Sequence, residues 1–363
     1  MKKIIISHKL LETCAVVLEN SEVTAIHFSR EDNPRLVGNI YKGRIKNILP
    51  GMQAAFVDIG RDKNVFLQFN ASKTFSVGQD ILIQIDKDEI GAKGARATLN
   101  ISLAGRLLIF LPTLSYIGVS SKIRGAERQR LHNLAKKIRP IDSGLIVRTA
   151  AEGCDEKFLL NDLANLLKVW NKICEKNVKK KSPALIYSDN NLIENILRDD
   201  FTPETEIIVD NLKIYRQLIE NVDTVTFYED SEQIFEAFGV AEEISKINQR
   251  ELSLPSGGQI VIDKTEALTA IDVNTGKFIG DKNFDETILK TNLEAAELIL
   301  KQLKLRDIGG IIIVDFIDMD NDANKKILMN FLHERAAFDR NKTKIIDMTP
   351  LGLVEITRQS SRH

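Results

Sequence analysis

The sequence has few cysteines and few prolines, and each scarcity excludes a class of protein. Its three cysteines, Cys14, Cys154 and Cys174, are odd in number, far apart, and form no C-x-x-C pair. We therefore exclude a disulfide framework and a thiolate zinc site, and expect free thiols in a reducing cytosol. With 8 prolines and 20 glycines in 363 residues, and 28% charged residues, the composition is that of a globular chain and not of a disordered or fibrous one.

Long apolar runs are also missing. At the start, MKKIIISHKL, only three isoleucines follow the lysines, well short of the ~7–15 apolar residues of a signal core. No other run approaches the ~18 apolar residues of a membrane span. We expect a cytoplasmic protein. The charges balance, with 50 basic and 51 acidic residues, so a polyanion has to be bound by a local patch and not by the net charge.

The first hundred residues read as β-structure, in a chain long enough for two or three domains. TCAVVLENSEVTAIHF, residues 13–28, is two strand-like segments around the polar turn Glu19-Asn20-Ser21, which predicts a hairpin. Residues 35 to about 104 contain short strands punctuated by glycines. That spacing predicts a small antiparallel barrel.

The middle of the chain has a mixed pattern. Residues 130–140 and 156–181 have helical apolar spacing, and SGLIVRT at 143–149 looks like a strand between them. We expect a small α/β unit here. The lysine-rich stretch NVKKKSP, residues 177–183, has three interpretations that stay open: a solvated helix end, a linker, or a surface that faces RNA.

In the final third, strands alternate with helices. Strands are expected at 257–263, 266–273, 311–316 and 344–348. A long helix is expected at 284–307, ended by Gly309-Gly310, and a second helix should carry Ile327, Leu328, Phe331 and Leu332 on one face. This order predicts a layered α/β domain, in which chemistry is usually found where the strands end.

Two of these strands end in an aspartate, Asp272 in LTAIDVN and Asp315 in IIIVDF. If the strands are neighbours, the two carboxylates meet at one edge of the sheet, and like charges so close are unfavourable unless a cation lies between them. Mg²⁺ suits two carboxylates plus a substrate phosphate. Asn274 is positioned to orient a carboxylate or a water. The residues alone leave open that either aspartate caps a helix or pairs with an arginine, and that Asn274 only forms a turn.

The barrel region interleaves aromatic and basic residues. Tyr41, Phe56, Phe66 and Phe69 alternate with lysines and arginines. Aromatic rings that stack on unpaired bases, beside cations that follow the backbone, are how OB-type barrels hold single strands. Half of such aromatics would be expected in the core.

Five stretches, in order along nearly the whole chain, resemble the catalytic half of the ribonuclease E/G family: GNIYKGRIKNILPGMQAAFVDIG, GLIVRTA, LPSGGQIVIDKTEALTAIDVNTG, TNLEAAELILKQLKLRDIGGIIIVDFIDM and LGLVEITRQ. The resemblance implies a multidomain α/β fold. In it, an RNase H-like domain (1–34 rejoined by 184–250) contains an inserted S1-type OB barrel (35–104) and a 5′-sensor (105–183). A DNase I-like catalytic domain (251–363) follows.

The resemblance also implies roles for single residues, each taken from a matched motif. Asp272 and Asp315 would be the Mg²⁺ ligands, with Asn274 as their hydrogen-bonding partner. The RNA-binding residues would be Phe56, Phe66, Lys93 and Lys342, where lysine replaces the family's arginine and loses the bidentate fork. The 5′-monophosphate pocket would be built by Arg148, Thr149, Gly105 and Ile109.

One departure concerns assembly. The family's Cys-Pro-x-Cys-type zinc link after the RQ motif has no counterpart before the sequence ends at Ser360-Ser361-Arg362-His363. We therefore expect no zinc and no zinc-linked dimer, while a homodimer formed in another way stays open.

The predicted function is a Mg²⁺-dependent endoribonuclease, with Mn²⁺ as an alternative ion. It would cut single-stranded RNA to 5′-phosphate and 3′-hydroxyl products, sense a 5′-monophosphate, and act in RNA processing or decay. The main alternative is a noncatalytic single-stranded RNA-binding protein of the same family. A metal-dependent phosphoesterase for small molecules ranks last, because it would leave the barrel without a purpose.

Overall fold

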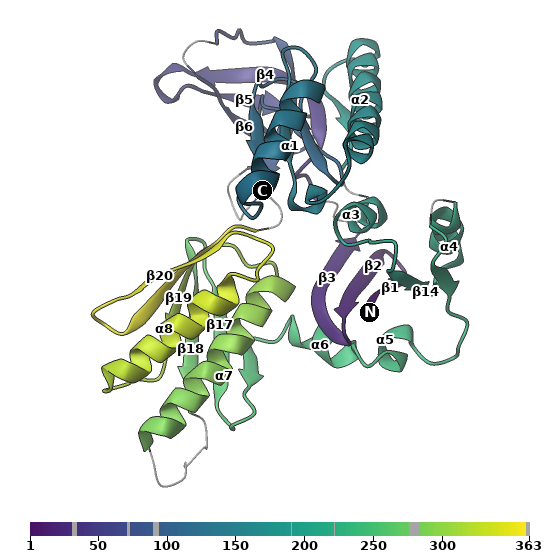
Figure 1. Ribbon diagram of the computed structural model, residues 1–363. Coiled ribbons are helices and arrows are strands. Elements are labelled where there is room, and N and C mark those ends of the chain that lie inside the picture. The colour runs from purple at the N-terminus through teal and green to yellow at the C-terminus, as the bar shows by residue number, and fades with distance from the viewer. Residues whose placement is uncertain are drawn as a thin grey trace. The chain divides into compact units, whose positions relative to one another are not determined.

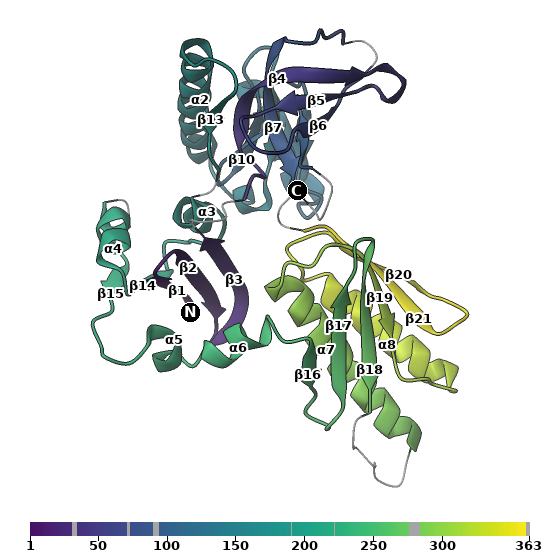
Figure 2. The same ribbon diagram turned by 180° about the vertical axis from the view of Figure 1, so that it is seen from behind.

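The computed structural model describes residues 1–30, 35–70, 73–89, 94–189, 191–220, 222–275 and 284–360. The chain forms two compact units, one made of Met1–Asp32 and Thr202–His363, the other of Asn33–Phe201 (Figures 1 and 2). The five predicted domain boundaries stay a prediction. The segment 184–201, which the family resemblance groups with 202–250 in one domain, belongs to the Asn33–Phe201 unit.

The Asn33–Phe201 unit contains a closed barrel. Its strands are β4 (Ile40–Leu49), β5 (Ala54–Asp58), β6 (Val65–Gln68), β7 (Asp80–Lys87) and β8 (Arg96–Thr98), and β13 (Ala184–Tyr187) adds to β4 from outside. The order β4-β5-β6-β8-β7 closes because β7 also pairs with β4. A short 3-10 helix, η1 (Pro50–Met52), joins β4 to β5. The predicted barrel is confirmed.

Alternating side chains explain the barrel core. Along β5 and β6, Ala55, Val57, Val65 and Leu67 are buried, because successive side chains of a strand point to opposite faces. Gly43 in β4 allows the strands to close, since a Cβ atom there would lie 2.4 Å from Val57 Cγ1.

The second layer of this unit is the predicted small α/β part, and it is confirmed. Its sheet has the order β11-β12-β10-β9. The elements are β9 (Leu103–Ala104), β10 (Leu108–Leu111), β11 (Ile117–Val119), α1 (Gly125–Ile138), β12 (Gly144–Val147), η2 (Thr149–Ala151), α2 (Glu156–Lys179) and α3 (Leu192–Asp199). Both long helices bury apolar residues in one core with the sheet. The lysine-rich stretch begins as the exposed end of α2.

The other unit contains two sheets. The first has the order β15-β14-β1-β2-β3, and the predicted hairpin is confirmed, with Asn20 and Ser21 at φ of 52° and 69° in its turn. Its elements are β1 (Lys2–Lys9), β2 (Glu12–Glu19), β3 (Glu22–Arg30), β14 (Glu206–Val209), α4 (Leu212–Ile219), β15 (Val225–Phe227), α5 (Ile234–Ala237) and α6 (Ala241–Lys246).

The three cysteines are free thiols, and burial raises the pKa of Cys14 to about 12.

The second sheet has the order β16-β17-β18-β19-β21-β20. Its elements are β16 (Glu251–Ser253), β17 (Gln259–Lys264), β18 (Leu268–Asn274), α7 (Phe284–Leu305), β19 (Gly310–Asp315), α8 (Asp322–Ala336), β20 (Thr343–Met348) and β21 (Leu353–Arg358). Both helices lie on one face of the sheet (Figure 2). The opposite face is open, and Ile311, the second residue of β19, is 52% exposed.

Two predicted details of the helices that pack on this sheet were wrong. The long helix ends at Leu305, before Gly309-Gly310, and the residue in the left-handed region after it is Asp307, at φ 48°. Ile327 is 46% exposed and does not share the buried face of Leu328 and Leu332, because its position on α8 points away from the sheet. Among the described helices, none combines the length and the apolar character needed to cross a membrane.

Candidate functional site

Asp272 and Asp315 lie side by side. Their strands β18 and β19 are parallel neighbours, joined through α7, and the register pairs Asp272 directly with Asp315. Neighbouring strands are about 4.8 Å apart, and paired residues point to the same face. Both side chains are exposed on the open face of the sheet, while the residues before them, Ile271 and Val314, are buried under the helices. The two carboxylates therefore lie next to each other on the open face of the sheet.

The electrostatics of this pair favour a cation. Partial burial raises the pKa of Asp315 above its usual value, and the charges of Asp272 and Asp318 raise it further. Nδ2 of Asn274 donates a 2.6 Å hydrogen bond to Oδ2 of Asp272, which leaves Oδ1 available and fixes the carboxylate plane. A positive ion between the aspartates would remove the repulsion. In the part of the chain that the structure describes, no three His, Cys, Asp or Glu side chains are grouped to hold a metal. An ion here would have few protein ligands, as suits Mg²⁺.

A buried asparagine fixes the loop that follows Asp315. Asn292 on α7 is fully buried. Its Nδ2 donates to the carbonyl of Ile317 at 2.8 Å, and its Oδ1 accepts from the Ile317 amide at 3.1 Å. The sequence does not point to this residue, because its position on a helix gives no sign of a partner 25 residues away. Its pairing holds the backbone two residues beyond Asp315.

Lys342 is not brought to the acid pair. It precedes Thr343, which pairs with Arg358, and Arg358 pairs with Gly310 at the start of β19. Asp315 is at the other end of that strand, about 16 Å away at 3.3 Å per residue. The exposed Lys342 side chain therefore lies at the opposite end of the sheet, and its predicted contact with RNA stays a prediction.

On the barrel, Phe56 and Phe66 form a row with basic residues. They pair across β5 and β6, with ring centroids 6.0 Å apart at 68°. The register continues from Phe66 to Arg96 on β8 and from Arg96 to Lys87 on β7. Both rings are half-buried and point away from the barrel core. Arg96 was missed in the sequence, because only strand pairing reveals that it lies beside Phe66.

The other two barrel aromatics belong to the core. Tyr41 is buried, and Phe69 packs on the core with its ring 5.0 Å from Phe75. The expectation that half of the aromatics would be structural fits this division. Lys93 lies outside the described residues.

The four residues of the predicted 5′-phosphate pocket come together beside β12. Nη1 of Arg148 donates a 2.6 Å hydrogen bond to the carbonyl of Gly105. The hydroxyl of Thr149 shares a 2.7 Å hydrogen bond with that of Ser120. Ile109 on β10 pairs with Ile146, two residues before Arg148. The role of these residues stays a prediction, but their proximity is a property of the fold.

Asp162 on α2 shapes this pocket and was missed. Its carboxylate accepts hydrogen bonds from the amides of Arg106, Leu107 and Leu108, at 2.9–3.2 Å. A Cβ atom on Gly105 would lie 2.5 Å from Oδ2 of Asp162, so only glycine fits. The carboxylate thereby fixes the turn that presents the Gly105 carbonyl to Arg148.

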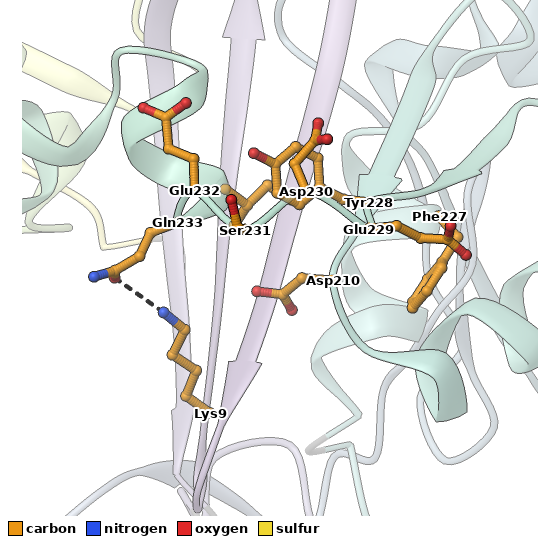
Figure 3. A pocket seen from close by; sticks show the side chains of 10 residues that line it. Lys9, Asp210, Phe227, Tyr228, Glu229, Asp230, Ser231, Glu232 and Gln233 are labelled. Atoms are coloured by element: carbon orange, nitrogen blue, oxygen red, sulfur yellow. Dashed lines mark hydrogen bonds between the residues drawn. The ribbon is translucent and has the colours of Figure 1, made fainter.

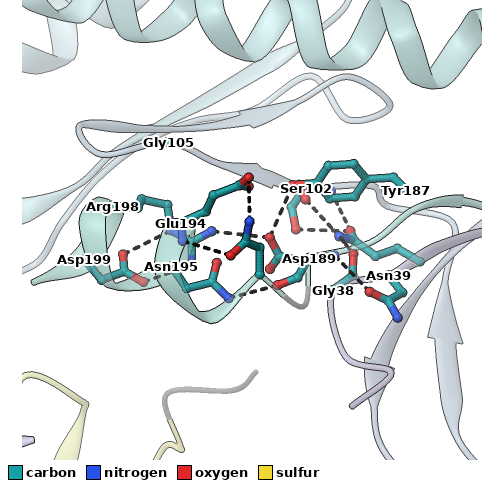
Figure 4. A network of polar contacts seen from close by, with 12 residues as sticks. Gly38, Asn39, Ser102, Gly105, Tyr187, Asp189, Glu194, Asn195, Arg198 and Asp199 are labelled. Carbon is teal, nitrogen blue, oxygen red and sulfur yellow. Dashed lines mark hydrogen bonds and ion pairs between the residues drawn. The ribbon is translucent and has the colours of Figure 1, made fainter. Parts of the chain in front are cut away.

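Arg148 is also linked to α3. Its Nη2 donates to Oδ1 of Asp199 at 2.7 Å, and Asp199 belongs to the polar network of Figure 4. In that network Arg198 contacts both Asp199 and Asp189, while Asn195 donates to the backbone carbonyl of Asp189.

A separate cavity of about 450 Å³ lies at the ends of β14 and β15 (Figure 3). Its lining includes four carboxylates and one lysine, namely Asp210, Glu229, Asp230, Glu232 and Lys9. Lys9 Nζ donates to Gln233 at 3.0 Å. An acidic lining repels nucleic acid, so this cavity does not suit a polyanion.

Comparisons with known proteins agree with the family resemblance of the motifs. A model of the ribonuclease E/G family matches residues 102–361. The chain is 39% identical to ribonuclease G of Salmonella typhimurium (strain SL1344) and of Escherichia coli (strain K12), over 97% of this chain and 78% of each relative. It is 37% identical to ribonuclease E of Synechocystis sp. (strain ATCC 27184 / PCC 6803 / Kazusa), over 95% of this chain and 56% of the relative.

Proposed function

The chain belongs to the ribonuclease E/G family and is an endoribonuclease, and from this premise we propose that it cuts single-stranded RNA at Asp272 and Asp315 with the help of Mg²⁺. The observation that carries the proposal is the direct pairing of these two acids on the open face of a sheet. Two adjacent carboxylates with one hydrogen-bonded amide have no structural purpose in an exposed position, but they suit a hard cation and a phosphate.

Each residue has a distinct task in this mechanism. Asp272 and Asp315 would hold the ion, and Asn274 orients the Asp272 carboxylate through its 2.6 Å hydrogen bond. When bound, Mg²⁺, or Mn²⁺ in its place, would provide a nucleophilic water at neutral pH and positive charge beside the scissile phosphate. The products would be a 5′-phosphate and a 3′-hydroxyl. Asn292 keeps the loop after Asp315 in place from behind.

The barrel would grip the substrate. Phe56 and Phe66 offer two outward rings. Arg96 lies next to Phe66, and its guanidinium forms an ion pair with Asp86 at 2.8 Å. Unpaired bases stack on such rings, whereas the bases of a duplex are already stacked on one another and are not available. The substrate is therefore single-stranded.

Arg148, Thr149, Gly105 and Ile109 would recognise a 5′-monophosphate. The guanidinium is partly exposed, with 27% of the side chain accessible, and guanidinium groups bind phosphate through parallel N–H donors. The parts that hold these sites would be an S1-type barrel and a 5′-sensor inserted in an RNase H-like domain, followed by a DNase I-like catalytic domain. We place the protein in the cytoplasm, in RNA processing or decay.

The test is removal of one charge at a time. Asp272→Asn and Asp315→Asn keep the shape of the side chain but weaken its hold on a cation, so we expect cleavage of a 5′-labelled oligoribonucleotide in Mg²⁺ to fall at least about 100-fold. RNA binding should stay within a few-fold, because the barrel is untouched. Asp263→Asn, at an exposed Arg250 ion pair on the neighbouring strand, is the control for a surface charge.

Two results would contradict this assignment. Near wild-type cleavage by either aspartate variant would remove the proposed metal site. A wild-type protein that binds the oligoribonucleotide but leaves it intact in both Mg²⁺ and Mn²⁺ would favour the alternative, a noncatalytic RNA-binding member of the family.

A further inference from the structure

Asp199 accepts a hydrogen bond from the guanidinium of Arg148. In the proposed function, the same guanidinium binds a 5′-phosphate. One N–H of Arg148 Nη2 points to Asp199 Oδ1 at 2.7 Å, and one N–H of Nη1 points to Gly105 at 2.6 Å. The two side chains are similarly accessible, 27% for Arg148 and 25% for Asp199. A phosphate bound to Arg148 would therefore lie within a few ångströms of the Asp199 carboxylate.

The carboxylate is ionised and firmly held. Burial works against its charge, but hydrogen bonds and charges from Arg198 and Arg148 outweigh burial and hold the pKa of Asp199 below its usual range. Arg198 adds two hydrogen bonds, at 2.9 and 3.2 Å. Asp199 is thus charged at neutral pH and cannot move away without breaking an ion pair with its own neighbour.

The helix that carries Asp199 is anchored on the same unit as Arg148. Asp189, which precedes α3, accepts from Tyr187 and Arg198 through Oδ1, at 3.3 and 3.4 Å, and its amide donates to Asn39 at 2.9 Å (Figure 4). The Asp199 charge is therefore a fixed feature of the pocket and not a chance contact of a loose side chain.

We propose that Asp199 is a specificity-determining residue of the 5′-end pocket, which selects a monophosphate by repelling the greater charge of a triphosphate. The inference rests on the proposed recognition of the 5′-phosphate by Arg148. A monophosphate carries about −1.5 to −2 at neutral pH, and each further phosphate adds negative charge. At separations well below the Debye length of about 8–10 Å, repulsion is weakly screened and grows with that charge.

This inference differs from selection by size. A narrow pocket would exclude a triphosphate whatever the charge of its wall, whereas an Asp199 carboxylate acts only through its charge. Asp199→Asn has nearly the same shape, retains an oxygen that can accept from Arg148, and loses the charge. Asp199→Glu keeps the charge. The two variants therefore separate charge from size.

The experiment measures equilibrium binding of one oligoribonucleotide with a 5′-hydroxyl, a 5′-monophosphate or a 5′-triphosphate, by fluorescence anisotropy without divalent ions. Asp199→Asn should tighten triphosphate binding about 10-fold and monophosphate binding about 3-fold, and leave the hydroxyl unchanged. Asp199→Glu should keep the wild-type preference. Glu156→Gln removes an equal charge from the exposed ion pair of Glu156 with Lys137 in the same unit. It is expected to leave the affinities for all three oligoribonucleotides unchanged. Melting temperatures show whether each variant is folded.

The outcomes distinguish the two levels of the proposal. If the wild-type protein binds monophosphate and hydroxyl ends equally, recognition of the 5′-phosphate is wrong, and the role of Asp199 is lost with it. If the wild-type protein prefers the monophosphate but Asp199→Asn leaves the ratio of triphosphate to monophosphate affinity unchanged, or weakens monophosphate binding, then Asp199 only orients Arg148 and the inference is overturned.

Discussion

At the scale of single residues, the arrangement that matters most is two like charges held side by side. The register of β18 and β19 pairs Asp272 with Asp315, and the raised pKa of Asp315 reflects desolvation and this repulsion. A folded chain accepts such a cost where a ligand relieves it. The sequence predicted that both aspartates lie at strand ends, because each follows a run of apolar residues. The sequence could not reveal to which face of the sheet their side chains point.

Asn292 was beyond sequence reasoning for a physical reason. Its two hydrogen bonds reach a backbone segment on another element, and nothing in the local pattern of a helix encodes such a contact. We regard it as a positioning residue, since it contacts the loop after Asp315 and not the acids themselves.

The prediction for Asn292 uses its neighbour as a control. Asn292→Ala leaves the amide and carbonyl of Ile317 unpaired, which costs about 1–3 kcal/mol of folding stability, and it also loosens the backbone near Asp315. Thr291→Ala removes an equally buried hydrogen bond, within α7, from Thr291 to Thr287. At a temperature where both are folded, Asn292→Ala should lower kcat for RNA cleavage about 10-fold with little change in KM, and Thr291→Ala should not. An equal loss in both would mean that Asn292 serves stability alone.

At the scale of elements, local patterns predicted much of the fold. Short strand-like stretches punctuated by glycines identified the barrel, and helical spacing identified α1, α2, α7 and α8. The pairings that close the barrel, β4 with β7 and β6 with β8, join segments far apart in sequence. No local pattern contains them. For this reason the row of Phe56, Phe66 and Arg96 emerged only from the structure, although the two aromatics were expected.

The outward row gives a prediction for strands β5 and β6. Stacking of a base on an aromatic ring contributes about 1–3 kcal/mol, so Phe56→Ala or Phe66→Ala should weaken binding of single-stranded RNA roughly 5- to 150-fold. Because the rings are in contact at 6.0 Å, the double variant should lose less than the sum of the two free energies. Fluorescence anisotropy with a labelled oligoribonucleotide measures both effects. Phe158→Ala, at a 55% exposed ring on α2, is the control, and equal losses there would show that the row has no special role.

At the scale of the whole molecule, each unit has cores of its own. The cores of the Asn33–Phe201 unit consist of buried residues between Leu36 and Ile186. Those of the other unit come from its first strands and from residues from Ile208 onward. A segment with a complete core can fold alone, and the inserted unit is continuous in sequence.

The last prediction follows from this division. A fragment of residues 33–201 should unfold cooperatively on heating, because it carries both of its cores, and should bind single-stranded RNA through Phe56 and Phe66. It should not cut RNA in Mg²⁺, because Asp272 and Asp315 belong to the other unit. Circular dichroism measures the melting, anisotropy the binding, and end-labelled RNA the cleavage. The fragment with Phe56→Ala is the control for binding. Cleavage by the fragment would contradict the assignment of the catalytic acids, and a fragment without cooperative melting would contradict the independence of the two units.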